Sequence, residues 1–209
     1  MTSALEALRR LREGNQRFAS NAAAFDARID PTRRQVLTTG QRPFAIILGC
    51  SDSRVPAELV FDQGLGDLFV IRVAGNIVAP SQVGSVEFAA DQFGTRLVVV
   101  MGHSQCGAVI ATVRELTEAG GQRSPNISAI VDRIRPSVES LQSASPELDT
   151  DTLVARAVRA NVRTSVDHLR HASPLLEELI ATRRLLVVGA EYSLGTGLVD
   201  FFYGAPESA

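Results

Sequence analysis

The chain of 209 residues contains no lysine, and all 21 of its basic residues are arginine. This absence excludes a mechanism that depends on a lysine Schiff base or on the lysine of a P-loop. The 21 basic and 23 acidic residues nearly balance, so there is no positive field for a polyanion and we expect no nucleic-acid partner. No apolar run reaches the ~18 residues of a membrane helix, so we expect no membrane partner.

Cysteine is also scarce, with only Cys50 and Cys106. Residues 1–18 alternate leucine with arginine and glutamate and lack the apolar run of a signal peptide, which predicts a cytosolic (cytoplasmic) location. A structural disulfide is disfavoured in that reducing compartment. The two thiols are therefore inert core residues, a redox pair or metal ligands.

Short apolar runs separated by helical segments predict the fold class. Four such runs are typical of strands buried on both faces: 44–49, 68–73, 97–102 and 185–189. Helical patterns cover residues 82–93, 105–119, 125–142 and 147–183, and the last two stretches have breaks near Pro146 and Pro174. We predict an α/β fold with a mostly parallel central sheet of four strands, flanked by helices. A turn at 192–197 leads into a C-terminal strand, 198–203, which we expect to pair antiparallel.

The N-terminal residues predict a helical arm. Leucines at helical spacing indicate an amphipathic helix over residues 3–18. Asp30 and Pro31 are typical of the start of a second short helix, and the residues between the two helices form a linker. We therefore divide the chain into an arm, residues 1–38, and a single α/β domain, residues 39–209.

Polar residues follow two of the predicted strands. Cys50 and Asp52 come after the first strand, and His103 and Cys106 come after the third. Ligands of open α/β sheets bind beyond the carboxyl ends of the strands, so these four side chains converge if the two strands are neighbours. Two thiolates, an imidazole and a carboxylate form a zinc-type set that is too soft for magnesium or calcium.

The presence of Arg54 indicates a catalytic zinc site rather than a purely structural one. Residues 50, 52 and 54 alternate, so an extended segment points them to one side. A catalytic zinc needs an open fourth position, and Arg54 can hold the Asp52 carboxylate bidentately, away from the metal. Water then takes the vacant position, where zinc lowers its pKa to about 7. Gly107 allows a backbone N–H to approach a molecule bound beside the metal.

Other interpretations of these residues are weaker. Each motif alone is more often structural, and a redox pair lacks the C-x-x-C spacing. Ser51, His103 and Asp52 lack the G-x-S-x-G elbow of a hydrolase triad. His168 and His171 lie three apart on an arginine-rich helix, which is more typical of a solvated face than of a second metal site.

The two motifs together, CSDSRV at 50–55 and HSQCG at 103–107, resemble the paired signature of the β-class carbonic anhydrases. Weaker similarities extend this resemblance over the whole chain, at residues 14–18, 40–43, 67–72, 85–88 and 188–192. A bicarbonate-inhibited subgroup of the family has tryptophan where this chain has Ile47, although Arg72 matches the arginine of that subgroup. The resemblance therefore implies the plant-like, uninhibited subtype.

The resemblance implies that Cys50, His103 and Cys106 bind a catalytic Zn2+ in the 39–209 domain. It implies that Asp52 and Arg54 form the dyad that switches the fourth zinc position between carboxylate and water. The expected reaction is reversible hydration of CO2 to bicarbonate and a proton by zinc-bound hydroxide. A carbonyl sulfide or carbon disulfide hydrolase on the same scaffold is the alternative, and a purely structural metal site is disfavoured because it has no use for Arg54.

The resemblance also implies a substrate pocket and self-association. Gln41, Phe69 and Phe88 would wall an apolar CO2 pocket, with Phe88 at a position where the subfamily often has tyrosine. Members of the family are dimers or higher oligomers whose N-terminal arm lies over the partner. We therefore expect a homodimer or homotetramer, and the sequence does not distinguish the two.

Overall fold

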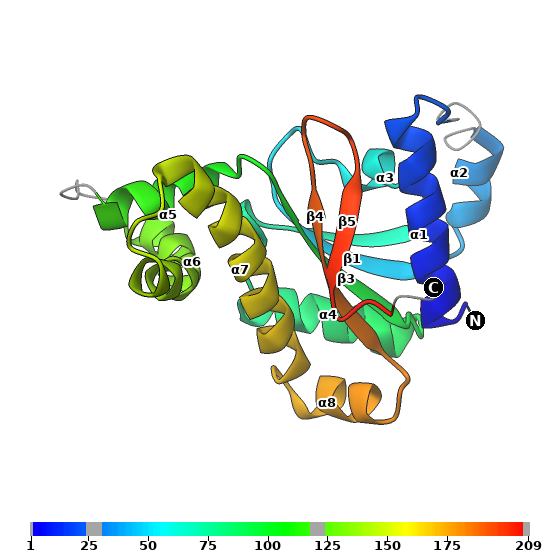
Figure 1. Cartoon of the computed structure of the whole chain (residues 1–209). Helices are drawn as coiled ribbons and strands as arrows, with labels where there is room; N and C mark the ends of the chain where they lie inside the picture. Colours follow the sequence, from blue (N-terminus) through cyan, green and yellow to red (C-terminus); the bar gives the residue numbers. More distant parts are fainter. Residues whose placement is uncertain (1, 24–30, 118–123, 207–209) are drawn as a thin grey trace.

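A five-stranded sheet with the strand order β2-β1-β3-β4-β5 forms the centre of the molecule (Figure 1). The structure, a computed structural model, describes residues 2–23, 31–117 and 124–206. Four strands are parallel: β1 (Ala45–Gly49), β2 (Leu68–Arg72), β3 (Leu97–His103) and β4 (Leu186–Tyr192). Strand β5 (Val199–Tyr203) pairs antiparallel with β4. The predicted fold class is confirmed.

Strands β1 and β3 are buried along their whole length, because helices cover both faces of the sheet. Successive side chains point to opposite faces, so Ile47 and Val99 join one core cluster and Ile46 and Val98 join another. The continuous apolar runs in the sequence follow from this double burial.

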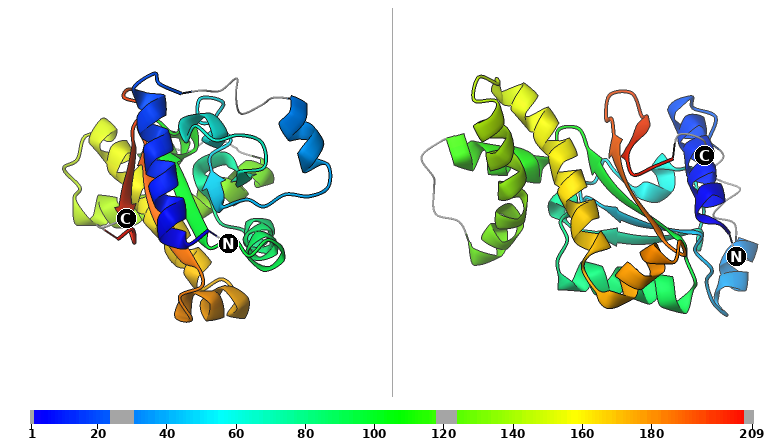
Figure 2. Two further views of the ribbon diagram at one scale, coloured as in Figure 1. Left: turned by 90° about the vertical axis from the view of Figure 1, so that its right-hand side faces the viewer. Right: turned by 60° about the horizontal axis from the view of Figure 1, so that its bottom comes forward.

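Helix α1 (Ala4–Ala19) packs on one face of the sheet, beside the short α3 (Ala57–Val60). Its buried Asn15 donates to the carbonyls of Val60 and Gly197 and accepts from the Val199 N–H. Helix α1 therefore contributes to the core of the α/β domain of its own chain. The second arm helix, α2 (Pro31–Leu37), buries no residue and lies apart from α1 (Figure 2). The domain boundary at residue 38 stays a prediction.

The opposite face of the sheet is covered by three helices: α4 (Pro80–Gln92), α7 (Thr150–Arg170) and α8 (Pro174–Ala181). Helices α5 (Gly107–Thr117) and α6 (Pro125–Ala144) pack with α7 in a third cluster, which contains both cysteines (Figure 1). In the described part of the chain, no helix is long and apolar enough to span a membrane.

Helix α7 lies directly on β3 because residue 102 has no side chain. A Cβ built on Gly102 would lie 2.6 Å from Cγ2 of Val162, which is closer than side chains approach. Val162 itself is fully buried. The Gly102–Val162 contact therefore fixes how closely the middle of α7 approaches the sheet.

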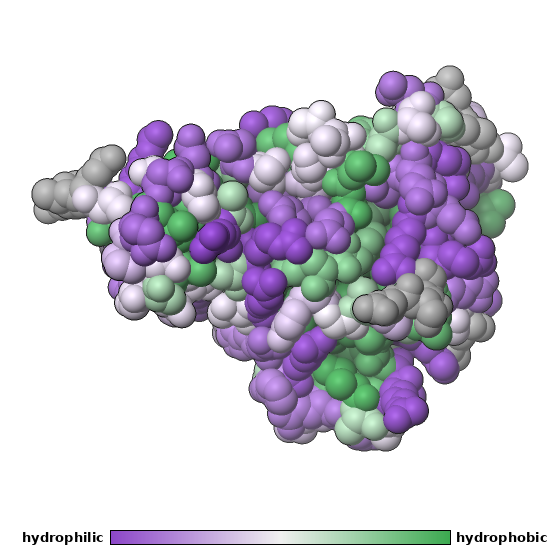
Figure 3. All heavy atoms as spheres, in the orientation of Figure 1, coloured by the Kyte–Doolittle hydropathy of each residue, from purple (hydrophilic) through white to green (hydrophobic). Residues whose placement is uncertain are grey.

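Strand β5 forms one edge of the sheet, and its side chains are only partly buried. In the space-filling view, hydrophobic surface gathers over this strand between the polar surfaces of α1 and α7 (Figure 3). The guanidinium of Arg159 lies 3.7 Å from the centre of the Phe202 ring and covers part of it. A cation–π contact of this kind stabilises the edge strand against α7.

The helix predictions differ from the structure mainly at their ends. The predicted helical stretch 147–183 divides into α7 and α8, with the predicted break at Pro174. Two short elements were not predicted, α3 and a 3-10 turn at Ala74–Asn76 (η2). Asp30, most of the predicted linker and residues 118–119 lie outside the described residues.

Candidate metal centre

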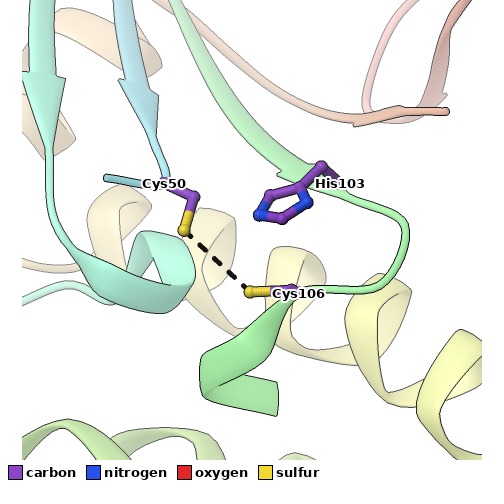
Figure 4. A group of neighbouring side chains, drawn as sticks. All are labelled: Cys50, His103 and Cys106. Carbon is purple, nitrogen blue, oxygen red and sulfur yellow. Dashed lines mark hydrogen bonds between the residues drawn. The ribbon is translucent and has the colours of Figure 1, made fainter. Parts of the chain in front are cut away.

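The carboxyl ends of β1 and β3 meet at one edge of the sheet, because the two strands are parallel neighbours. Cys50 follows β1, His103 ends β3, and Cys106 lies in the loop directly before α5. Their side chains point toward one another (Figure 4). One possible ligand atom from each of the three residues lies within 4.8 Å of the others.

The two sulfurs are spaced for a shared metal ion. Sγ of Cys50 lies 4.0 Å from Sγ of Cys106, and neither thiol is in a disulfide. Tetrahedral zinc with Zn–S bonds of ~2.3 Å would place two sulfurs ~3.8 Å apart. A disulfide would require ~2.05 Å. The observed spacing therefore fits two sulfur ligands of one metal ion.

His103 presents an unprotonated nitrogen to this group. Its Nδ1 lies 2.9 Å from the Ser104 carbonyl oxygen, which can only accept, so Nδ1 carries the hydrogen in the neutral ring. Nε2 is fully buried and has no hydrogen-bond partner among the described residues. A ring fixed in this tautomer by a backbone carbonyl is the usual state of a metal-binding histidine.

The two thiols share one proton. A hydrogen bond from the Cys106 thiol holds the pKa of Cys50 far below its usual value. The same hydrogen bond, together with burial, raises the pKa of Cys106. The opposite shifts favour a thiolate at Cys50 and a thiol at Cys106, and a bound cation would replace the remaining proton.

Asp52 stands beside the group and is held by Arg54. Arg54 Nε and Nη2 donate to the two carboxylate oxygens at 2.9 and 2.7 Å, and the Arg54 backbone N–H donates at 3.0 Å. These bonds hold the pKa of Asp52 well below its usual range. Oδ2 of Asp52 lies 3.9 Å from Nε2 of His103. The carboxylate therefore lies beside His103 and is bound by the Arg54 guanidinium.

The carboxyl end of β2 and the turn after it support this loop; the sequence analysis named Arg72 only for its match to the inhibited subgroup and did not name Gly75. Arg72 donates to the carbonyls of Cys50 and Asp52 at 3.0 and 2.7 Å. The Gly75 N–H donates to the Cys50 sulfur at 3.3 Å. Strand β2 is parallel to β1, so its carboxyl end lies at the same edge. Inspection of the carboxyl end of every predicted strand, including its last residues, would have pointed to both Arg72 and Gly75.

The predicted pocket residues lie away from the three possible ligands of their own chain. Phe69 pairs in register with Ile46, near the start of β1. The Phe88 ring lies 6.3 Å from the Phe69 ring, and Phe88 is 52% exposed. Gln41 precedes β1 and lines a hollow of about 670 Å³ beside the carboxyl end of α4. The structure thus gathers these residues around the amino ends of β1 and β2, whereas Cys50 follows the carboxyl end of β1.

Three further residues from the sequence analysis lie on the surface of the chain. Gly107 is the first residue of α5, directly after Cys106, and it is exposed. The structure leaves open space where its side chain would be. His168 and His171 are exposed on the surface, as predicted for a solvated face.

The comparisons with known proteins agree with this geometry. The family model described as carbonic anhydrase matches residues 45–199. Carbonic anhydrase 2 of Mycobacterium tuberculosis is 36% identical over 199 residues, 94% of this chain and 91% of that protein. The carbonic anhydrase of Mycolicibacterium smegmatis is 37% identical over 190 residues, 91% of this chain and 89% of that protein.

Solved structures show the same fold. The β-carbonic anhydrase CafA of Aspergillus fumigatus superposes with a TM-score of 0.75 at 27% identity, over 84% of this chain and 83% of that one. A Coccomyxa β-carbonic anhydrase, solved in complex with acetazolamide, gives a TM-score of 0.73 at 27% identity, over 91% of this chain and 83% of that one. The chain belongs to the β-carbonic anhydrase family of enzymes.

Proposed function

We propose that the chain catalyses the reversible hydration of CO2 to bicarbonate and a proton, with one zinc ion held by Cys50, His103 and Cys106. The observation that carries the proposal is the convergence of these three side chains, with sulfurs 4.0 Å apart. Membership of the carbonic anhydrase family supports the choice of reaction. Two sulfurs and one nitrogen favour zinc over magnesium or calcium.

Zinc held by three protein ligands supplies a bound water that ionises near neutral pH. The protein contributes a buried position for the ion, since all three side chains are at most 5% exposed. His103 keeps its Nε2 lone pair directed to the group because Nδ1 is bound to the Ser104 carbonyl. Cys50 and Cys106 supply negative charge in a site with little solvent to screen it.

We assign Asp52 and Arg54 the role of a gating dyad. With both carboxylate oxygens bound by Arg54, Asp52 would stay off a bound zinc ion and could accept a hydrogen bond from a water held there. If the Arg54 contacts broke, the carboxylate, 3.9 Å from His103 Nε2, would be free to act as a fourth ligand in place of the water. The state with Arg54 bound is the active one.

We propose that Gln41, Phe69 and Phe88 line the CO2 site of a second copy of the chain, next to Gly107. Their separation from Cys50 of their own chain and the 52% exposure of Phe88 support this. Two β-carbonic anhydrases of Sordaria macrospora, 25% identical with a TM-score of 0.74, are described as tetrameric. Light scattering on the purified protein tests the proposal: a dimer or tetramer is expected, and a stable, active monomer contradicts it.

Stopped-flow CO2 hydration tests the proposed reaction. The zinc-loaded chain is expected to accelerate hydration at alkaline pH, and removal of zinc with a chelator is expected to abolish the rate. The same preparation assayed with carbonyl sulfide and carbon disulfide distinguishes the alternative hydrolase. Turnover of the sulfur compounds without CO2 hydration contradicts the proposal.

We also propose a cytosolic location. The site needs both thiols free, and their sulfurs lie 4.0 Å apart, so an oxidising compartment would favour their pairing. Localisation of the tagged chain by fractionation tests this.

A further inference from the structure

The 3-10 turn η2, residues 74–76, presents a backbone hydrogen-bond donor to the candidate metal centre. The N–H of Gly75 lies 3.3 Å from Sγ of Cys50. Gly75 and Asn76 both have positive φ angles, 69° and 44°. The left-handed region is uncommon for residues other than glycine, although asparagine adopts it more readily than most, and the buried Asn76 Nδ2 has no hydrogen-bond partner among the described residues. The turn therefore needs support from elsewhere in the fold.

Helix α7 supplies that support through two buried polar side chains. Nδ2 of Asn161 donates to the Gly75 carbonyl at 2.8 Å, and Oγ of Ser165 donates to the Asn76 carbonyl at 3.1 Å. Asn161 is 1% exposed and Ser165 is 4% exposed. The two residues are four apart and so lie on the same face of the helix. Together they hold consecutive carbonyls of the turn.

These two side chains interrupt an otherwise apolar helix face. Val158, Val162 and Val166 surround them and are buried. A buried amide is unfavourable unless it is hydrogen-bonded. The bond from Asn161 Nδ2 to the Gly75 carbonyl offsets the cost of burying this side chain. Val162, adjacent to Asn161, contacts the backbone of Gly102, which sets the distance between α7 and the sheet.

We propose that Asn161 is a positioning residue for the zinc site. By holding the Gly75 carbonyl, it orients this residue so that its N–H points at the Cys50 sulfur. A hydrogen bond to a thiolate stabilises its negative charge and fixes the direction of its lone pairs, as outer-shell partners of metal ligands do. This inference rests on the proposed function, because that proposal makes Cys50 a metal ligand.

Zinc affinity, measured by competition with a chromophoric chelator, tests the role without relying on activity. Asn161→Leu removes the amide, and Asn161→Asp keeps its shape but removes the donor. Each is expected to lower zinc affinity by about tenfold or more, in the range found for outer-shell partners. Ser137→Ala is the matched control, since it removes a buried hydroxyl contact to Thr164 between α6 and α7 that does not involve the carbonyls of the turn.

Cobalt substitution gives a second readout that a loss of packing alone would not change. In the Co2+-loaded protein, loss of the hydrogen bond to sulfur raises the energy of the sulfur lone pairs. The thiolate-to-cobalt absorption band is therefore expected to move to longer wavelength in both Asn161 variants and to stay in place in Ser137→Ala. Should Asn161→Leu not fold, Asn161→Asp carries the test.

The outcomes separate this inference from the proposed function. Loss of zinc affinity with a displaced band in an Asn161 variant, and neither in Ser137→Ala, supports the positioning role. A folded Asn161 variant with zinc affinity within twofold of the parent and an unmoved band overturns that role alone. A parent chain that binds no zinc contradicts the proposed function as well.

Discussion

The contact between Gly102 and Val162 gives a prediction whose size follows from the structure. In Gly102→Ala, the new methyl group would lie 2.6 Å from Cγ2 of Val162. Carbon atoms in contact lie ~3.5–4.0 Å apart, so α7 must retreat by about 1 Å. Overpacking of this kind costs roughly 1–3 kcal/mol. For a chain of this size that corresponds to a fall in Tm of roughly 2–12 °C.

A double-mutant cycle isolates this contact. Val162→Ala removes two buried methyl groups and is expected to cost about 1.6 kcal/mol, before any term for the cavity. In the double variant, the alanine methyl at residue 102 occupies space that the valine vacates. The two changes should therefore destabilise the protein by about 1–2 kcal/mol less than their sum.

Urea denaturation of the three variants, combined with zinc competition, measures both consequences. Because α7 carries Asn161 and Ser165, zinc affinity should fall in Gly102→Ala and recover in part in the double variant. Strict additivity of the unfolding free energies would refute the packing argument. A destabilised Gly102→Ala with unchanged zinc affinity would show that the position of α7 does not influence the metal centre.

Three further variants test other parts of the account. Cys50→Ser should abolish CO2 hydration, and substantial turnover in this variant would be inconsistent with a Cys50 ligand. Asp52→Ala should keep zinc but lose most of its turnover, and activity equal to the parent would contradict the dyad. The pKa of Asp52 is lowered on folding, so its contribution to stability is complete above the ordinary carboxyl pKa of about 4 and declines as the pH falls further. Acid unfolding of Asp52→Ala should therefore depend less steeply on pH below that value. Asn15→Leu leaves the Val60 and Gly197 carbonyls and the Val199 N–H without their partner, and calorimetry should show a loss of about 1–3 kcal/mol or more. An unchanged Tm would mean that α1 does not pack against its own chain.

The central sheet was predictable because double burial leaves a strong signal in the sequence. The runs 44–49 and 97–102 are apolar throughout, and β1 and β3 occupy almost the same residues. The polar residues that follow them were identified for the same reason, since parallel strands end at one edge of the sheet. Strand order was the missing information, and the pairing of β1 with β3 supplies it.

Contacts between distant segments were not predictable from local pattern. In the sequence, Asn161 is one polar residue among many in a long predicted helix. Only the folded structure places it against Gly75. Helix α1 has an apolar stripe that fits its own sheet as well as a partner, so the sequence did not show which of them it covers. The positions of Phe69 and Phe88 relative to Cys50 depend on the strand register, which the sequence does not specify.

The metal content of the purified chain tests the central claim most directly. Elemental analysis of protein prepared without added metal or chelator, normalised to protein concentration, is expected to give one zinc per chain. The matched Cys106→Ser preparation is expected to contain little or none. A parent chain without tightly bound zinc, or a Cys106→Ser chain with a full complement, would contradict the assignment of Cys50, His103 and Cys106 as the metal centre.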